Sequence, residues 1–283
     1  MKAGRASQTA ELVCLGRAVA HALALVPGFE DPTAAALLPA RLDARLARAL
    51  QGPEPPGFRA KVDRSFLRRH SKIMAVRTLA IDAALRAASA PQVVILGAGL
   101  DGRAWRMPEL ADSLVLEVDH PDSQADKRTR VAALTQRARE VRFLPVDFAR
   151  DSLRDALARA QHDPALRTMW LWEGVVMYLT PAQVEATLAV VAERSAPGSH
   201  LSILYHSPHW ILKLVGLVVR RVGEPLRSAF TPAVMRALLA KFAFRVLADA
   251  NVHELSHELT PELGSEAKYA AHLRLVTAER APV

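Results

Sequence analysis

The sequence predicts an α/β fold, in which a helical N-terminal cap over residues 1–90 precedes a seven-stranded sheet domain over residues 91–283. Residues 1 to about 90 have the pattern of helices throughout. After them, short apolar runs alternate with helical segments, which is typical of a parallel sheet with crossover helices. A glycine-rich loop follows the first apolar run directly, as it does in doubly wound sheets.

Three helices are expected in the cap. The first covers residues 10–25. Asp31 and Pro32 have the pattern of an N-cap followed by proline at the first helical position, so a second helix is expected from there to Leu50. The proline- and glycine-rich stretch 51–57 predicts a loop, and residues 68–88 predict the third helix.

Seven apolar runs predict the strands. Thr180 and Gln183 form a capping-box pattern after the fourth run, and Thr231 before Pro232 predicts another helix start. The last two runs have no evident long helix between them, so they are expected to pair antiparallel at one edge of the sheet. The runs are VVIL from Val93, LVLEVD from Leu114, VRFLPVD from Val141, TMWLWEGV from Thr168, LSILYH from Leu201, FRVLADA from Phe244 and LRLVTAE from Leu273.

Composition narrows the class of protein. With 51% hydrophobic residues, the chain of 283 residues can bury a large core. Cys14 is the only cysteine, which excludes an intrachain disulfide and a cysteine-based zinc site, and no metal is expected. The N-terminus makes a poor signal peptide, and the most apolar segment, residues 210–219, is too short to span a bilayer. A cytoplasmic protein without stable membrane insertion is therefore expected.

The net charge of +8 does not by itself indicate a nucleic-acid partner. Most arginines occur singly, and no long basic block with interleaved aromatic residues occurs. We therefore expect the charge to be spread over solvated helix faces and the partner to be a small molecule. The oligomeric state, monomer or homodimer, is left open.

The loop GAGLDG contains Gly97, Gly99 and Gly102 in the spacing G-x-G-x-x-G, which is also that of dinucleotide-binding loops. A dinucleotide loop must lead into a proper helix that faces the pyrophosphate. Here only five residues separate Gly102 from Pro108, so the third glycine is interpreted as coincidence. The backbone at Gly97 and Gly99 is expected to approach a different nucleotide-like cofactor; a tight turn without a ligand is the alternative.

Three carboxylates follow the next strands. Asp119 ends the second run and suits ribose hydroxyls, Asp147 follows the third and suits an adenine amino group, and Glu173 ends the fourth. Because carboxyl ends of parallel strands share one sheet edge, these groups and the loop are expected to form one site. Each carboxylate alone is more often a cap or an ion-pair partner, but together they favour S-adenosylmethionine.

The sequence resembles the leucine carboxyl methyltransferase family, including bacterial members that methylate small molecules in secondary metabolism. The matching stretches are ILGAGLDGRAWRMP, LEVDHPDSQADK, FLPVDF, LWEGVVMYLTPAQV and SAPGSHLSI, with SQTAELVCLGRA, FEDPTAAALL and AVRTLAIDAAL upstream. The resemblance implies the Rossmann-like class I methyltransferase fold with an antiparallel last strand and a helical lid over about 206–240. It implies cofactor contacts at Arg77, Gly97, Asp119, Asp147, Phe148 and Glu173, and a weaker one at Arg17.

The same resemblance implies that Tyr178 contacts the substrate; a packed tyrosine at a helix start is the alternative. The sequence departs from the family where Gly102 replaces a more usual threonine and Ala149 a frequent arginine, and where the fifth strand ends in YHSPHW. A carboxylate acceptor needs no base, whereas a hydroxyl does, and His206 is the first candidate for it.

The function expected is O-methylation of a carboxylate or hydroxyl on a small, lipophilic metabolite. A protein C-terminal carboxyl methyltransferase and a non-catalytic cofactor-binding regulator are the alternatives. A nucleic-acid methyltransferase is disfavoured, because WEGVVMY stands where the Asn/Asp-Pro-Pro-aromatic motif for amino methylation would follow the fourth strand.

Overall fold

The computed structural model describes all residues except 1–7, 52–56, 149, 211, 213–224 and 283. The helices of the cap are α1 (Gln8–Ala22), α2 (Ala34–Leu37), α3 (Asp43–Leu50) and α4 (Phe58–Ala88). The strands are β1 (Gln92–Leu96), β2 (Leu114–Asp119), β3 (Glu140–Pro145), β4 (Thr168–Trp172), β5 (His200–His206), β6 (Phe244–Asn251) and β7 (Leu273–Arg280). The helices between them are α5 (Arg103–Arg106), α6 (Pro121–Val131), α7 (Leu153–Arg159), α8 (Pro181–Glu193), α10 (Pro232–Lys241), α11 (Val252–Leu259) and α12 (Pro261–Ala267).

The seven strands form one sheet in the order β3-β2-β1-β4-β5-β7-β6. The pairs from β3 to β5 are parallel, and β7 runs antiparallel to both β5 and β6. This confirms the α/β sheet and the antiparallel pair at its edge. Two short helices, α11 and α12, and a 3-10 turn (Lys268–Ala270) connect β6 to β7, so the chain returns locally rather than by a long crossover.

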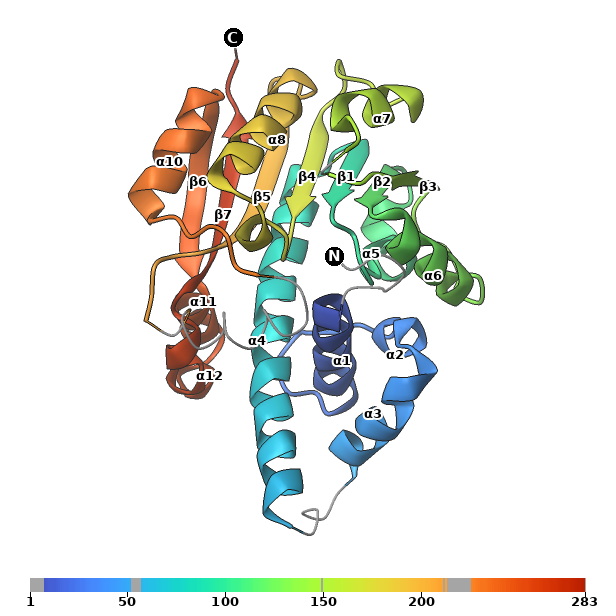
Figure 1. Cartoon of the computed structure of the whole chain (residues 1–283), viewed down its shortest axis with the longest axis vertical. Coiled ribbons are helices and arrows are strands. Elements are labelled where there is room, and N and C mark those ends of the chain that lie inside the picture. The colour runs from blue at the N-terminus through green and yellow to red at the C-terminus, as the bar shows by residue number, and fades with distance from the viewer. Residues whose placement is uncertain (1–7, 52–56, 149, 211, 213–224, 283) are drawn as a thin grey trace.

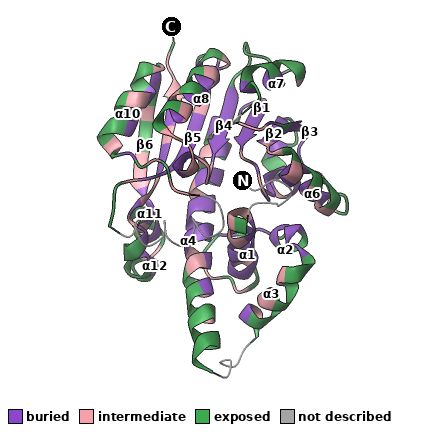
Figure 2. Cartoon of the chain, in the orientation of Figure 1, coloured by how far each residue is buried: buried purple, intermediate pink, exposed green. Residues whose placement is uncertain are grey.

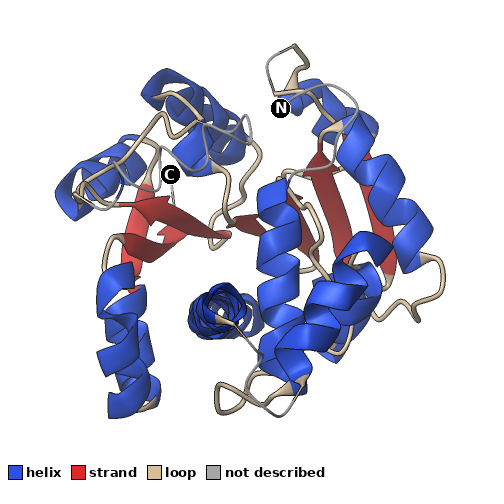
Figure 3. Ribbon diagram, turned by 60° about the horizontal axis from the view of Figure 1, so that its bottom comes forward, coloured by secondary structure: helices blue, strands red, loops and turns tan. Residues whose placement is uncertain are grey.

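Helices cover both faces of the sheet (Figure 3). Every residue of β1 is buried, and successive residues alternate between two cores: Val93 and Ile95 join the core beneath α1 and α4, while Val94 and Leu96 join the core beneath α7, α8 and α10. A continuous apolar strand of this kind is what a central parallel strand requires. The cap helices α1 to α3 lie beyond the ends toward which β1 and β4 point (Figure 1).

The cap differs from the sequence prediction in three places. The expected single helix to Leu50 is wrong, because Leu38 and Pro39 are extended and separate α2 from a 3-10 turn and α3. A residue before proline avoids the helical region, which explains the break. The third helix begins at Phe58, ten residues earlier than expected. The predicted N-cap at Asp31 is also displaced: α2 begins at Ala34 with Thr33 at its N-cap, although Oδ1 of Asp31 accepts from the amides of Thr33 and Ala34.

Part of the expected lid lies outside the described residues, at 211 and 213–224. The last part of the predicted span 206–240 is α10, which packs against β6. Thr231 caps α10 as the sequence predicts. Among the described helices, none combines the length and the apolar character needed to cross a membrane.

Candidate functional site

The loop after β1 is held against β2 by its own backbone. Gly97 has φ +71° and Gly99 has φ +45°, a region that favours glycine. The amides of Gly97 and Ala98 donate to the carbonyl of Val118, at 2.7 and 3.1 Å. A Cβ on Gly97 would lie 2.1 Å from Cγ2 of Val175, the side chain that follows β4. The loop therefore lies between the carboxyl ends of β2 and β4, with no room for a side chain at Gly97.

Asp119, the last residue of β2, anchors this loop. Its Oδ2 accepts from the amide of Gly99 at 2.5 Å, and its Oδ1 accepts from the amide of His120 at 2.6 Å. Burial raises the pKa of Asp119, and the two amide donors offset only part of that rise. The carboxylate and the glycine loop thus form one unit at the place where the sequence predicted ribose recognition.

Glu173 begins the loop after β4 and lies between two buried arginines. Its Oε1 is 3.1 Å from Nε of Arg77, on α4, and its Oε2 accepts from Nη1 of Arg103, on α5, at 3.0 Å. Burial raises the pKa of Glu173, but Arg103 and Arg77 outweigh it, so the pKa lies below its ordinary value. Glu173 is therefore ionised and joins the cap to the sheet.

The two arginines differ in how fully their charge is matched. Arg103 also pairs with Asp101 and, at 2.7 Å, with Asp82, and its pKa is raised despite burial. Burial lowers the pKa of Arg77, which Glu173 only partly counteracts. Because Glu173 is shared with Arg103, the guanidinium of Arg77 is the under-compensated cation of the site. It fits a ligand carboxylate.

The same ionic cluster extends into the cap. Arg106 pairs with Asp82 at 2.7 Å, and Arg17 pairs with Asp31 at 3.3 Å. Arg17, on α1, also donates from Nη2 to the carbonyl of Leu100 in the glycine loop at 2.5 Å. The cluster holds four arginines and four carboxylates, which are Arg17, Arg77, Arg103, Arg106, Asp31, Asp82, Asp101 and Glu173.

Sequence reasoning missed Arg103, Arg106, Asp82 and Asp101 as members of this cluster. The sequence did contain one signal for them, because these charged residues stand within apolar stretches of small residues. Charged side chains in such stretches are costly to bury unless they are paired. Their partners could not be read from the chain, because Arg103 reaches residues 21 and 70 positions away.

Asp147 and Phe148 follow β3, whose residue Pro145 is in register with Asp119. Both are half-buried, and Oδ2 of Asp147 lies 3.8 Å from Nε of Arg150, which is largely exposed. They thus lie along the same sheet edge as Asp119 but outside the ionic cluster. Phe148 packs beside the core beneath α8, as Val175 does.

The two expected catalytic residues come from the ends of β4 and β5. Tyr178 ends a 3-10 turn (Val176–Tyr178). It is close enough to Arg77 to raise the pKa of the Arg77 guanidinium. His206, the last residue of β5, is buried, and its ring packs edge-on against His272 with centroids 5.1 Å apart. Burial, with contributions from His272 and Arg77, lowers the pKa of His206 to about 3. His206 is therefore neutral at physiological pH.

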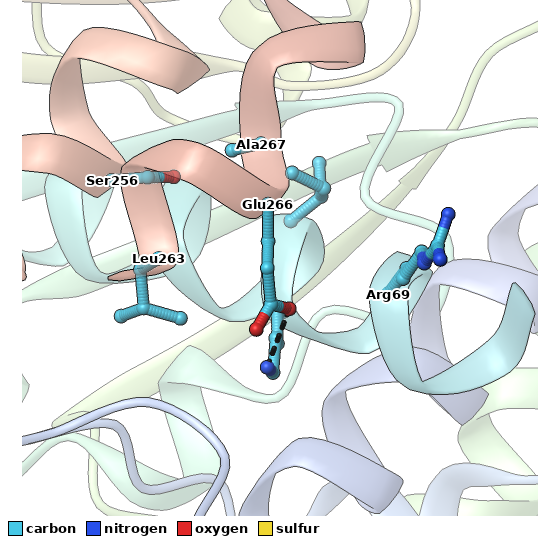
Figure 4. Close-up of a pocket in the computed structure, with 7 residues that line it drawn as sticks. Arg69, Ser256, Leu263, Glu266 and Ala267 are labelled. Atoms are coloured by element: carbon cyan, nitrogen blue, oxygen red, sulfur yellow. Dashed lines mark hydrogen bonds and ion pairs between the residues drawn. The ribbon is translucent and has the colours of Figure 1, made fainter. Parts of the chain in front are cut away.

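The cavity drawn in Figure 4 lies apart from the predicted site residues. It is a small apolar crevice between α4 and the α11–α12 pair, with Arg69, Ser256, Leu263, Glu266 and Ala267 around it. Lys72 and Glu266 form an ion pair across it at 2.6 Å. None of the predicted site residues lines this crevice. Among the described residues, no cluster of side chains suits a metal ion.

The sheet order, the glycine loop beside Asp119 and the acidic end of β4 define the class: an S-adenosylmethionine-dependent methyltransferase of the class I fold. Comparison with solved structures supports the fold. A protein of the DUF574 family from Streptomyces avermitilis superposes with a TM-score of 0.59 at 16% identity, over 99% of both chains. A protein from Thermobifida fusca, described as a methyltransferase, does so with 0.56 at 16%, over 94% of both.

The model of the leucine carboxyl methyltransferase family matches residues 10–192. A Mycolicibacterium gilvum protein named as an S-adenosyl-L-methionine-dependent methyltransferase is 38% identical over 233 residues, 78% of this chain and 72% of that protein. One of the same name from Mycobacterium marinum is 38% identical over 70% of this chain and 65% of its own length. This chain belongs to the leucine carboxyl methyltransferase family, and its cofactor is S-adenosylmethionine.

Proposed function

We propose that the enzyme methylates an oxygen, a carboxylate or hydroxyl, on a small lipophilic metabolite. The observation that carries this proposal is that α4, which holds Arg77, and the 3-10 turn that ends at Tyr178 both contact β5, whose last residue is His206. Tyr178 influences the pKa of Arg77, and Arg77 that of His206, so the three groups share one electrostatic environment. The half-buried apolar residues Val175 and Leu179 flank Tyr178 in the same loop, which suits an apolar acceptor.

For the cofactor we assign one role to each residue. Arg77 takes the carboxylate of the amino-acid end, because its charge is under-compensated. The backbone of Gly97 and Gly99 allows close approach of that end, Asp119 accepts from the ribose hydroxyls, and Asp147 with Phe148 meets the adenine. Glu173 is ionised and holds Arg77 in place, and Arg17 fixes the loop through Leu100. The donor and acceptor set matches a ligand with a carboxylate at one end and a ribosyl adenine at the other.

When bound, S-adenosylmethionine supplies a methyl group already activated by its sulfonium. The protein's part is to hold the acceptor oxygen in line with that methyl group and to exclude water. Tyr178 is assigned to hydrogen bonding with the acceptor. A neutral His206 can accept a proton, but with a pKa of about 3 it is a weak base, so an acceptor that is already an anion is served best.

The test combines titration calorimetry with an acceptor panel. Micromolar binding of S-adenosylmethionine and S-adenosylhomocysteine, lost in Asp119→Ala, is expected. Methyl transfer is then assayed on aryl and fatty acids, on matched phenols and alcohols, and on a peptide ending in leucine. Transfer to small acids or hydroxyl compounds supports the proposal. Transfer only to the peptide makes the chain a protein carboxyl methyltransferase, and cofactor binding without turnover on any acceptor makes it a regulator; either result overturns it.

A further inference from the structure

Three large apolar side chains stand in solvent on the first turns of α4. Phe58 is 81% exposed, Val62 50% and Phe66 53%. A spacing of four residues places them on one side of the helix. They line a shallow surface groove together with Arg59 and Asp63. We call Phe58, Val62 and Phe66 the aromatic ridge. The first turns of α4 lie at one end of the molecule, and most of their residues are exposed (Figure 2).

The ridge is exposed for a structural reason. The opposite side of the same turns is occupied by packing, since Leu67 and Ser71 are buried. At about 100° per residue, Leu67 lies on the far side of the helix from the ridge. The helix therefore already has its core contact through this side, and within the ridge Phe66 stacks on His70, with ring centroids 5.8 Å apart. Other large exposed apolar residues, such as Leu166 and Leu247, occur singly within the described part of the chain.

Positive charge surrounds the ridge. Arg59, Lys61 and Arg69 are exposed on the same turns. Arg59 lies three residues before Val62 and Arg69 three residues after Phe66, so by the helical repeat both are on the ridge side of the helix. The acidic residue of these turns, Asp63, forms an ion pair with Arg45 of α3 at 2.7 Å. The surface presented around the ridge is thus apolar with a cationic border.

We propose that the aromatic ridge docks the enzyme onto an anionic lipid surface. A bilayer interface offers phosphate groups to the cationic border and an apolar layer to the ridge, the arrangement that interfacial helices use. Three side chains supply far less than the roughly 800 Å² per partner of a stable protein interface. A second copy of the chain would also bring the same cations against one another. Charge and size together favour lipid as the occupant.

The test is co-sedimentation of the full chain with vesicles, which needs no methyl acceptor and no turnover. One vesicle contains phosphatidylcholine alone, and the other contains phosphatidylcholine mixed with phosphatidylglycerol. The ridge variant is Phe58→Ser with Phe66→Ser. The matched control is Leu166→Ser with Leu247→Ser, because these two apolar residues are 45% and 44% exposed elsewhere. Circular dichroism and thermal unfolding confirm that each variant is folded.

Binding is expected to the mixed vesicle and not to phosphatidylcholine alone, and to weaken as salt rises. The ridge variant should lower the partition coefficient at least about tenfold, since each phenylalanine loses its burial in the interface. The control should bind as the unmodified chain does. Equal binding of the ridge variant, or no binding of the unmodified chain to either vesicle, overturns the proposal. So does a concentration-dependent dimer that the ridge variant abolishes.

Discussion

At the residue scale, the site depends on one guanidinium that the protein does not fully neutralise. Arg77 has Glu173 as its acidic partner, and that carboxylate is shared with Arg103. In this buried position an unmatched cation is costly, and a ligand carboxylate relieves the cost. Arg103, by contrast, is matched by Asp82 and Asp101 as well and serves the fold.

The first prediction concerns this asymmetry. Arg77→Gln should weaken binding of S-adenosylmethionine about ten- to hundredfold, because a charge-assisted hydrogen bond to the cofactor carboxylate is lost. Titration calorimetry measures the dissociation constant. Arg86→Gln, on the exposed side of the same helix, is the matched control and should bind normally. Arg77→Gln protein that is folded and binds with unchanged affinity would contradict the assignment.

A second residue-scale prediction follows from the contact between Gly97 and Val175. Gly97→Ala should lower the free energy of unfolding by about 2 kcal/mol or more, since it combines a positive φ with a steric overlap. Adding Val175→Ala removes the overlap but not the backbone strain. The double variant should therefore be more stable than the sum of the single changes predicts, measured by urea unfolding. Strict additivity would show that the two residues do not meet.

At the element scale, the threonine caps predicted at the starts of α8 and α10 were confirmed. The capping box at the start of α8 is present in full: Thr180 accepts from the amide of Gln183, and the side chain of Gln183 accepts from the amide of Thr180. Such a pair satisfies two amides that the helix itself leaves free. The start of α8 is therefore set by four consecutive residues.

The prediction at this scale is that Thr180→Ala destabilises the protein by about 1 kcal/mol through loss of the cap. Urea unfolding at constant pH measures it. Thr129→Ala, an exposed threonine inside α6, is the control, because its hydroxyl bonds only to carbonyls of the preceding turn. An equal loss of stability in both variants would mean that the capping box adds nothing.

At the scale of the whole molecule, folding buries several histidines in the neutral form. Burial lowers the pKa of His70 and His162 to about 4 and that of His206 to about 3. The unfolded chain binds protons at these groups near pH 6.5, and the folded chain does not. Each therefore contributes stability that is complete above pH 6.5 and is lost as pH falls toward its folded pKa. Glu117 changes the free energy of unfolding in the opposite direction as pH falls. Burial, only partly offset by Lys127, raises its pKa to about 7, so the folded chain holds this proton more tightly than the unfolded chain does.

Because these contributions oppose one another, the test compares variants with the unmodified chain and does not rely on the overall pH dependence of the free energy of unfolding. Replacing His162 by Gln should reduce the loss of unfolding free energy between about pH 7.5 and pH 5.5 by about 1 kcal/mol. Urea unfolding at the two pH values measures this. The exposed His257→Gln variant is the control. If His162→Gln loses as much stability on acidification as the unmodified chain, the histidine is not the group that titrates.

Much of the fold was readable because it follows from local pattern. The strand runs at Val93, Leu114 and Thr168 and the cap at Thr180 were all confirmed. The break at Pro39 was missed although proline announces it, and the early start of α4 at Phe58 was missed because those turns lack a buried face over most of their length.

By itself, the sequence determined the class of sheet, the order of its strands along the chain and the carboxylates at their ends. Those features depend on periodicity and on the rule that parallel strands end at one edge. Only the tertiary structure decided which charges meet. Asp82 and Glu173 lie 21 and 70 positions from Arg103 along the chain, and yet the three residues form one buried cluster. Pairing of buried charges is set by packing of the cap on the sheet, which no local pattern encodes.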